Sequence, residues 1–413
     1  MKIVHFSDVH IGVENFSRTD PETGLPSRLL DFLATLDEVV DYCIAGEVDL
    51  ALFCGDAYKS RDPSQTHQRE FARRIARLSG AGVATFLVEG NHDIPAVAGR
   101  ATALDIFRTL DVAGVTVGNQ LSNYLVETRS GPVQILAVPW VRRSGFLARD
   151  ETRGLAPEQV NELIQMRLTD IVADRVASLD PAIPAVLAGH LTVSEAKTSS
   201  EQSMMLGRDY VLLKSSLAVP QLDYVALGHI HRHQVLGERP HLVYSGALQR
   251  VDFGEEKDEK GFCVIELDAA SKQGERMTSF EFVGVNARRL LTISVDVKDG
   301  DLDPTGTVVS AIASHEVADA VVRVQISIAS GDEAGLADAP MRSALEGAHF
   351  VASISREVRQ ENRTRLGGEY DSSTGPREAL ELYLKTAEVP EKRAAVLLEY
   401  AATLIDETEP ERP

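Results

Sequence analysis

The sequence predicts an α/β protein: a larger first domain with a mostly parallel sheet, a second, smaller α/β domain, and a C-terminal helical tail. Three observations lead to this prediction. Between residues 2 and 88, short apolar runs alternate with amphipathic helical patterns, which is the order of right-handed strand–helix–strand units. The composition turns polar at residues 271–276. Strict alternation of apolar and polar residues then begins at residues 291–297, as in a half-buried strand.

The elements of the first domain, residues 1–270, follow from these patterns. Strands are predicted where short β-rich runs are bounded by turn residues, at 2–7, 50–53, 83–88, 124–127, 133–138, 185–190, 224–227, 241–244 and 262–267. Helices are predicted where apolar residues recur every three or four positions, at 29–44, 65–78, 102–110 and 157–177. The polar segments 13–27 and 192–207 predict loops.

The second domain, residues 285–360, and the tail, residues 377–407, are shorter. Strands at 291–297, 321–328 and 350–354 are predicted to alternate with helices near 307–314 and 341–348. Residues 361–376 are polar and contain glycine, which predicts a linker. Two amphipathic helices follow at 377–386 and 391–406, separated by Pro390. Their apolar stripes suit either a hairpin folded onto its own domain or docking onto a partner, and spacing does not choose between them.

Composition limits the class of protein. The chain has 413 residues, of which 44% are hydrophobic and 25% charged, as in ordinary soluble globular proteins. Its three cysteines form no Cys-x-x-Cys pair, which argues against disulfides or a thiolate metal site. With neither a signal peptide nor an apolar stretch long enough to span a bilayer, we expect a cytoplasmic protein without membrane segments.

The charge of the chain weighs against nucleic acid as a ligand. Its formal net charge is −20, whereas a phosphate backbone attracts lysine and arginine. Clustered basic residues could nevertheless form a local cationic surface. They are Arg61, Arg69, Arg73, Arg74, Arg77, Arg142 and Arg143. Net charge therefore lowers the expectation of a nucleic-acid enzyme without excluding it.

Polar residues follow five of the predicted strands at their carboxyl ends. The candidate metal ligands among them are Asp8, His10, Asp56, Asn91, His190, His229 and His231. Sites gather at this edge of α/β sheets, and a glycine precedes the polar residue in four of the five runs. One such residue alone is more often a cap or a satisfied polar group, so His5, His67 and His233 are not included. Five compatible strand ends together predict a metal site.

The donor atoms indicate the chemistry. Carboxylate, amide and imidazole groups without thiolate suit manganese, iron or zinc. Seven ligands are too many for one open catalytic ion, but they fit two ions that share a carboxylate and clamp a phosphate ester. His92 directly follows Asn91 and is predicted to be the general acid on the leaving oxygen, with Asp93 as its candidate orienting group.

Several motifs together resemble a known family. Asp8-Val9-His10, Gly55-Asp56, Gly90-Asn91-His92-Asp93, Gly189-His190 and Gly228-His229-Ile230-His231 resemble the calcineurin-like metallophosphoesterases. Residues 244–256, followed by Lys260-Gly261-Phe262, are similar to the SbcD family of nuclease subunits within that superfamily. The resemblance implies a four-layer αββα sandwich followed by a small capping domain.

The resemblance also implies a division of ligands and an activity. Asp8, His10 and His231 would hold one manganese ion, Asn91, His190 and His229 the other, and Asp56 would bridge them. The implied activity is 3′-to-5′ exonuclease on double-stranded DNA and endonuclease on single strands and hairpins, in DNA repair, recombination and replication. Relatives often carry a His or Asp shortly after the bridging Asp, where this chain has Lys59, which can meet a DNA phosphate but not a metal while protonated.

The resemblance implies two partners, DNA and an SbcC-like ATPase that binds the C-terminal helices. It also implies a homodimer of this chain within a heterotetramer, and association with the nucleoid when the complex is on DNA. The apolar positions of 29–44 and 102–110 suit such a homodimer or a core. One rival function is a phosphoesterase of small molecules or proteins, which would share every ligand. Another is a non-catalytic binding protein with structural metal, although the spare imidazole of His92 argues against it.

Overall fold

A computed structural model of the chain describes residues 1–95, 99–142, 146–147, 153–198, 210–359, 376–387 and 389–408. The chain divides into two compact units. The first comprises Met1–Ile293, Ile312–Val324 and Ala344–Ile354, and the second comprises Ser294–Ala311, Gln325–Ser343 and Ser355–Pro413.

The first unit contains two six-stranded sheets. The strands of the first sheet are β1 (Lys2–Phe6), β2 (Leu50–Phe53), β3 (Ala84–Val88), β4 (Val115–Gly118), β13 (Gly261–Leu267) and β14 (Met277–Gly284). They lie in the order β14-β13-β1-β2-β3-β4. The four strands from β1 to β4 are parallel, and the β13–β14 hairpin adds an antiparallel edge.

The second sheet has the order β11-β12-β10-β7-β6-β5. Its strands are β5 (Ser122–Thr128), β6 (Gly131–Val138), β7 (Ala185–His190), β10 (Tyr224–Gly228), β11 (Gln234–Glu238) and β12 (His241–Tyr244). The four central strands are parallel, and β5 and β11 pair antiparallel at the edges. The short strands β8 (Thr192–Val193) and β9 (Val211–Leu212) pair with each other.

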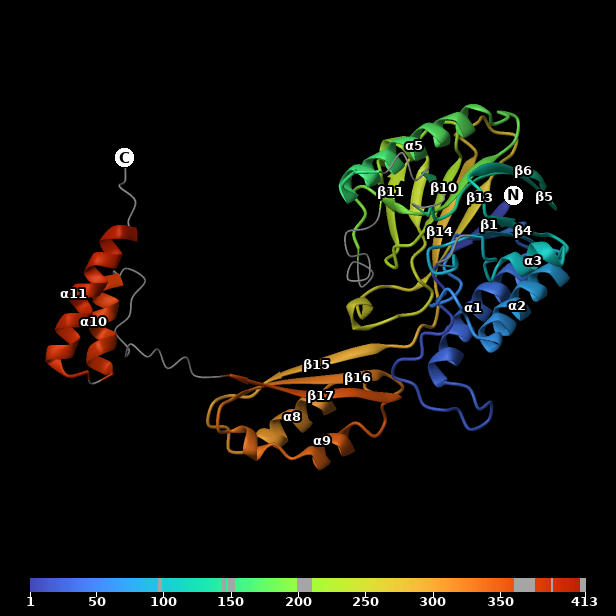
Figure 1. Ribbon diagram of the computed structural model, residues 1–413. Helices are drawn as coiled ribbons and strands as arrows, with labels where there is room; N and C mark the ends of the chain where they lie inside the picture. The colour runs from blue at the N-terminus through green and yellow to red at the C-terminus, as the bar shows by residue number, and fades with distance from the viewer. Residues whose placement is uncertain are drawn as a thin grey trace. The chain divides into compact units, whose positions relative to one another are not determined.

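Helices cover the outer faces of both sheets, and the predicted four-layer αββα fold is confirmed. Figure 1 shows the helices on opposite sides of the paired sheets: α1 (Ser27–Ala45), α2 (Gln65–Gly80) and α3 (Asp105–Thr109) on one side and α5 (Pro157–Ala177) on the other. The short helix α7 (Lys214–Leu217) shares the core on the α5 side. Successive side chains of a strand point to opposite faces of its sheet and so pack in different layers. In β2, Phe53 packs with Leu33 of α1, whereas Leu52 packs between the sheets with Ile135.

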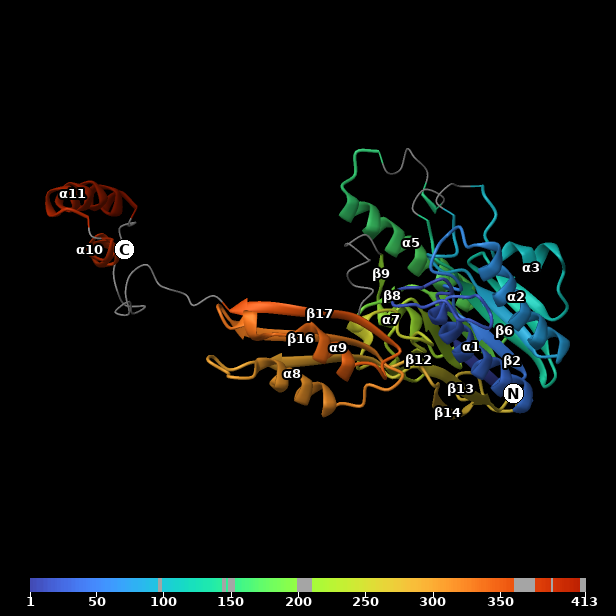
Figure 2. The same ribbon diagram turned by 90° about the horizontal axis from the view of Figure 1, so that it is seen from below.

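A smaller three-stranded sheet follows, with the order β15-β16-β17. Its elements are β15 (Leu290–Asp296), α8 (Pro304–Ala313), β16 (Val321–Ala329), α9 (Asp338–Ala344) and β17 (Phe350–Arg359). The tail forms α10 (Pro376–Thr386) and α11 (Glu391–Thr408), which lie side by side (Figures 1 and 2). Two single-turn helices, η1 (Phe253–Glu255) and η2 (Glu333–Gly335), also occur among the described residues.

The structure differs from the predicted elements at the edges. Strand β14 begins at Met277, immediately after the polar residues that predicted the end of the first domain. Edge strands such as β4, β11 and β14 give weak sequence patterns, because β4 has only four residues and most residues of β11 and β14 are half-buried or exposed. The predicted linker up to residue 375 and most of the loop at 192–207 lie outside the described residues. Among the described residues, no helix is long and apolar enough to cross a membrane.

Candidate metal centre

The polar residues that follow the strands meet at one edge of the two sheets. In the first sheet β1, β2 and β3 are parallel neighbours, with Phe6 opposite Phe53 and Phe53 opposite Leu87. In the second sheet His190 of β7 lies opposite Gly228 of β10. Parallel strands end at the same edge, so the residues after them come together. This edge holds all the predicted ligands: Asp8, His10, Asp56, Asn91, His190, His229 and His231.

The two sheets approach each other closely at this edge, and glycine makes the approach possible. A Cβ atom on Gly228 would lie 2.1 Å from the carbonyl oxygen of Cys54. A Cβ atom on Gly90 would lie 2.1 Å from Oδ1 of Asp56. Any side chain at these positions would displace a backbone or a candidate ligand. The same Cys54 carbonyl accepts a hydrogen bond from Nδ1 of His190 at 2.7 Å, which links the two sheets.

Four of the candidate ligands have left-handed backbone conformations. The φ angles are 52° at Asp8, 49° at His10, 61° at Asp56 and 95° at His229. Such conformations cost non-glycine residues on the order of 1–3 kcal/mol each and persist where the surroundings fix them. Here the amide of Asp8 donates to the carbonyl of Gly55 at 3.0 Å, and that of His10 donates to the carbonyl of Asp56 at 3.1 Å. Strain concentrated in one place is typical of a functional site.

Asp8, His10 and His231 form the first group of donors. Nε2 of His10 lies 2.9 Å from Nε2 of His231 and 3.9 Å from Oδ1 of Asp8. Nδ1 of His231 donates to the Glu255 carboxylate at 2.7 Å, so its Nε2 carries the lone pair of the neutral ring. Burial, together with the nearby His231, holds the pKa of His10 well below its usual value. Metal ligation requires this neutral form of imidazole.

Asn91, His190 and His229 form the second group. Oδ1 of Asn91 lies 2.9 Å from Nε2 of His190 and 3.0 Å from Nδ1 of His229. Because Nδ1 of His190 donates to the Cys54 carbonyl, its Nε2 is the nitrogen left for ligation. One amide oxygen and two imidazole nitrogens therefore converge in this group.

Asp56 stands between the two groups. Its Oδ2 lies 3.7 Å from Nε2 of His10 and 3.4 Å from Nε2 of His190. Burial acts to raise the pKa of Asp56, but His190 and His92 outweigh it and hold that pKa well below its usual value. Burial likewise acts to lower the pKa of His190, but Asp56 raises it to about 9. A proton must leave His190 before its Nε2 can bind a cation, so metal binding here releases a proton.

His92 stands beside the first group and Asp56. Its ring centroid is 5.1 Å from that of His10, and its backbone amide donates to Oδ1 of Asp56 at 2.8 Å. Nδ1 of His92 donates to the carbonyl oxygen of Lys59 at 2.7 Å. The Lys59 carbonyl thus fixes the ring and leaves Nε2 as the nitrogen that can exchange a proton.

The Asp93 side chain accepts hydrogen bonds from backbone N–H groups. This corrects its predicted role as the orienting group of His92. Its buried carboxylate accepts the backbone N–H groups of Asp56 at 2.8 Å, Ala57 at 3.0 Å and Gly90 at 2.9 Å. These bonds tie the loop after β2 to the loop after β3. The atom that orients the His92 ring is the carbonyl oxygen of Lys59.

Three residues beside the ligands were not predicted as part of the site. Glu255 and Lys260 contact His231, and both lie in the sequence block that carries the resemblance, so a signal for them was present. The ring of Trp140 lies 5.0 Å from that of His229 and 5.1 Å from that of Tyr210. No spacing pattern in the sequence indicated this stack, because it depends on how the chain beyond β6 lies beside the end of β10, with β7 between the two strands.

The two donor groups fit a pair of divalent cations. One ligand atom from each of Asp8, His10 and His231 lies within 4.8 Å of the others, and the same holds for Asp56, His190 and His229. Oδ1 of Asn91 lies at hydrogen-bond distance from His190 and His229, at 2.9 and 3.0 Å. All donors are oxygen or nitrogen, and the three cysteines are buried and free. Such a set suits manganese, iron or zinc.

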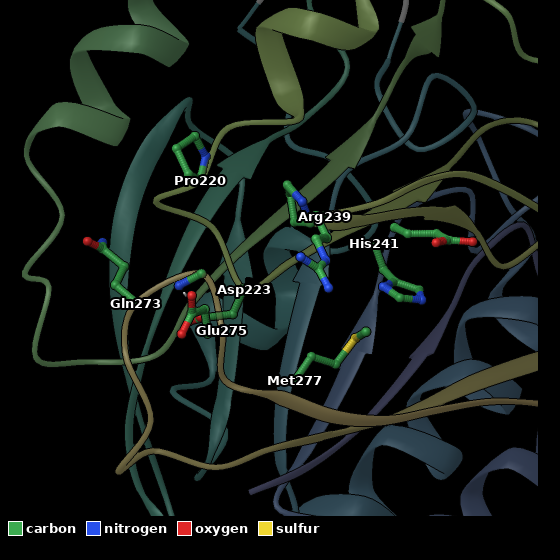
Figure 3. Close-up of a pocket in the computed structure, with 10 residues that line it drawn as sticks. Pro220, Asp223, Arg239, His241, Gln273, Glu275 and Met277 are labelled. Carbon is green, nitrogen blue, oxygen red and sulfur yellow. Dashed lines mark hydrogen bonds between the residues drawn. The ribbon is translucent and has the colours of Figure 1, made fainter.

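A separate pocket lies at the opposite ends of β10 and β12. It has a volume of about 570 Å³ and is lined by residues that include Asp223, Arg239, His241 and Glu275 (Figure 3). The Asp223 carboxylate is already satisfied, because Arg276 lies 3.1 Å away and the amide of Gly274 donates to it at 2.7 Å. Its lining shares no residue with the two donor groups.

Comparisons with known proteins agree with this geometry. The model of the calcineurin-like phosphoesterase family matches residues 1–233, which include every candidate ligand and His92. The SbcD component of nuclease SbcCD from Escherichia coli (strain K12) is 26% identical over 262 residues, 62% of this chain and 62% of that protein. The protein of the same name from Rhodobacter capsulatus is 28% identical over 288 residues, 65% of this chain and 66% of that protein.

The match to a third relative covers more of this chain. DNA double-strand break repair protein Mre11 of Archaeoglobus fulgidus is 23% identical over 357 residues, 77% of this chain and 70% of that protein. The chain therefore spans just under two thirds of the two SbcD proteins and more of the Mre11 protein.

Proposed function

The chain belongs to the calcineurin-like phosphoesterase family, and from this premise we propose that it is a two-metal DNA nuclease. We infer 3′-to-5′ exonuclease activity on double-stranded DNA and endonuclease activity on single strands and hairpins, in the processing of DNA ends. The observation that carries the proposal is the pair of donor groups around Asp56, with His92 beside His10 and Asp56.

The ligands divide between two ions in this proposal. Asp8, His10 and His231 would hold one, Asn91, His190 and His229 the other, and Asp56 would bridge them. We propose manganese, because carboxylate and amide oxygens beside imidazoles suit it. When bound, the pair supplies a hydroxide nucleophile and stabilises the charge on the attacking and leaving oxygens.

His92 would act on the leaving group. With Nδ1–H held by the Lys59 carbonyl, protonated Nε2 can donate to the leaving oxygen of the cleaved strand. Asp93 would act through Asp56, because it fixes the loop that carries the bridging carboxylate. Asp93 is therefore a positioning residue in this proposal.

DNA is the proposed substrate despite the net charge of −20. The loop after Asp56 carries two exposed cations, Lys59 and Arg61, next to the site. Nε of Arg61 donates to the carbonyl of Asn91 at 3.2 Å. Positive charge beside His92 supports binding of a phosphate backbone, and the relatives' names include a nuclease and a break-repair protein. The rival, a phosphoesterase of small molecules or proteins, would use the same ligands, and the same two cations would attract its anionic substrates.

An SbcC-like ATPase is the proposed partner of the tail helices. Leu384 of α10 is buried, whereas Tyr383 of α10 and Val396, Leu397 and Tyr400 of α11 are 40%, 50%, 41% and 73% exposed. Exposed apolar and aromatic residues on an amphipathic helix support docking onto a partner.

A homodimer within the complex is proposed on the second of the two predicted stretches, 102–110, and not on the first. The apolar residues of α1, such as Leu29 and Leu33, are buried in the core under the first sheet. On α3, Ile106 is 46% exposed, and Leu110 directly after that helix is 67% exposed. These two side chains support a second copy at α3.

The first experiment offers linear double-stranded DNA, labelled at the 5′ or the 3′ end, to the purified chain with manganese. We expect shortening from the 3′ end. Replacing His92 by Ala should lower the rate by about 10²–10⁴-fold, because a general acid contributes that much, while manganese binding measured by calorimetry stays unchanged. His315→Ala, at an exposed histidine outside both donor groups, should cut as fast as the wild type.

A generic aryl phosphodiester distinguishes the rival function. Hydrolysis of this ester with every DNA substrate left intact, even with the purified ATPase added, would overturn the nuclease and leave the family assignment in place. DNA cleavage by His92→Ala at the wild-type rate would show that His92 is not the general acid.

A further inference from the structure

A buried ion pair lies directly behind the candidate ligand His231. Nδ1 of His231 donates to Oε1 of Glu255 at 2.7 Å, and Nζ of Lys260 donates to Oε2 of Glu255 at 2.7 Å. The side chains of Glu255 and Lys260 are both fully buried. Nζ of Lys260 also donates to the backbone carbonyl of His231 at 3.1 Å. One lysine therefore contacts both the backbone of the ligand and the carboxylate that holds its ring.

The carboxylate of Glu255 is well satisfied. The backbone amide of Val251 donates to its Oε2 at 3.2 Å, in addition to the bonds from Lys260 and His231. Burial acts to raise the pKa of Glu255, but His231 and Lys260 outweigh it and hold that pKa well below its usual value. The ammonium of Lys260 and the amide of Val251 both donate to Oε2, which leaves Oε1 of Glu255 to accept the Nδ1 proton of His231.

The local sequence explains how the pair is built. The single turn η1 ends at Glu255 and begins after Asp252, whose side chain accepts the amide of Gly254 at 2.7 Å. Strand β13 begins at Gly261, directly after Lys260. The turn and the strand start hold the two charged side chains at opposite sides of one short loop.

The neighbouring glutamate points elsewhere. Oε1 of Glu256 accepts the backbone amide of Thr292 at 2.8 Å, and Oε2 accepts its hydroxyl at 2.5 Å. Two adjacent glutamates thus have separate partners: Glu255 holds a candidate metal ligand, and Glu256 holds the first residues of β15. This arrangement supplies a matched control.

We propose that Glu255 and Lys260 are a positioning pair that fixes the tautomer and orientation of His231 and so sets the affinity of the Asp8–His10–His231 site for its metal, but not that of the second site. The inference rests on the proposed two-metal function. A carboxylate bonded to the far nitrogen of a ligating histidine fixes the ring and raises its basicity, and its loss commonly costs 10–100-fold in metal affinity. Neither residue is catalytic in this proposal, because both side chains are fully buried and act through His231.

The test measures manganese binding to the metal-free full chain, by electron paramagnetic resonance of the free ion during titration. The wild type should bind two ions. In Glu255→Gln one site should weaken by about 10–100-fold, while the other stays within about threefold. Glu256→Gln should bind both ions as the wild type does. A nitrogen-resolved NMR spectrum of the histidines adds a second readout, since the Nδ1–H form of His231 should be depleted only in the Glu255 variants.

Removing one member of a buried pair can unfold the chain, because it leaves an unpaired buried charge. The double variant Glu255→Gln/Lys260→Met removes both charges and should show the same weakened site with a retained melting transition. Wild-type affinity at both sites in this double variant would overturn the positioning role, as would equal weakening of both sites.

The outcome for the nuclease is separate. A wild type that binds two ions but leaves DNA intact would overturn the nuclease only, since the positioning pair is judged by metal binding. A wild type that binds fewer than two ions would overturn both.

Discussion

His5 shows how a polar side chain can belong to the core and not to the site. It is fully buried between the two sheets. Its Nε2 donates to the carbonyl of Leu227 at 3.2 Å, so its Nδ1 accepts the hydroxyl of Tyr224 at 3.0 Å. Burial lowers the pKa of His5 to about 3 from its ordinary value of 6.5. The folded chain therefore keeps His5 neutral over the whole physiological range.

This pKa predicts acid sensitivity of the metal-free chain. Above pH 6.5 His5 is neutral in both states; below it, the unfolded chain binds a proton that the folded chain excludes until about pH 3. Stability should therefore fall as the pH falls between these values. His5→Gln, whose amide can make both bonds without titrating, should lose about 2 kcal/mol less than the wild type between pH 7 and pH 5.

Urea unfolding of both chains in a metal chelator, at the two pH values, measures this difference. Equal losses in the two chains would contradict the assignment of the acid sensitivity to His5.

At the residue scale the strand ends predicted which side chains come together, because a ligand must follow a strand to reach this edge. The contacts behind the ligands were not predictable in the same way. Asp93 binds the backbone of Asp56 and Ala57, and Glu255 binds His231 across 24 residues of sequence. Both depend on how loops fold over one another, which no spacing pattern encodes.

At the scale of elements, the close approach of β10 to β2 sets the position of the ligands. Gly228→Ala would place a Cβ 2.1 Å from the Cys54 carbonyl and 2.8 Å from Cβ of Ser7. Both neighbours lie in a buried sheet that cannot yield cheaply. We expect a loss of several kcal/mol in the free energy of unfolding, in the range of severe core substitutions, together with loss of manganese binding.

The matched control is Gly80→Ala. Gly80 lies in the last turn of α2, and a Cβ there would meet nothing within 4 Å. Alanine should stabilise the helix by up to about 1 kcal/mol. Thermal unfolding of both variants checks the pair, and a Gly228→Ala chain as stable as the wild type would refute the close approach.

The element order of the αββα core was predictable because its strands are buried and its helices amphipathic. Helix α5 was predicted at residues 157–177, which are its bounds in the structure. The strands that escaped prediction are edge strands, and the turn η1 that carries Glu255 has only three residues. Pairing with a neighbour, not their own pattern, makes these segments regular.

At the scale of the whole molecule, chemistry and proposed assembly use different parts of the chain. The candidate ligands all belong to the first compact unit, and the tail helices to the second. The bounds of the predicted domains, 1–270, 285–360 and 377–407, remain predictions, as does the docking of the tail.

This separation predicts that a substitution in the tail can weaken binding of the ATPase without changing DNA cleavage by the chain alone. Tyr400 of α11 is 73% exposed, and Tyr400→Asp places a charge on the proposed docking face. Binding to the purified SbcC-like ATPase should weaken at least tenfold, since buried aromatic anchors commonly contribute about 2 kcal/mol or more. Manganese-dependent DNA cleavage by the chain alone should be unchanged.

Ala395→Asp introduces the same side chain at another exposed position of α11 and should bind the ATPase nearly as the wild type does. Undiminished binding by Tyr400→Asp would move the docking site away from this face.

The position of Trp140 beside two candidate ligands makes one ion site accessible to fluorescence. Trp140 is the single tryptophan of the chain, and its ring lies 5.0 Å from that of His229 and 6.3 Å from that of His190. All tryptophan emission therefore originates within contact distance of one candidate ion site. Paramagnetic ions quench nearby fluorophores, so the unmodified chain carries its own optical reporter of whether that site is filled.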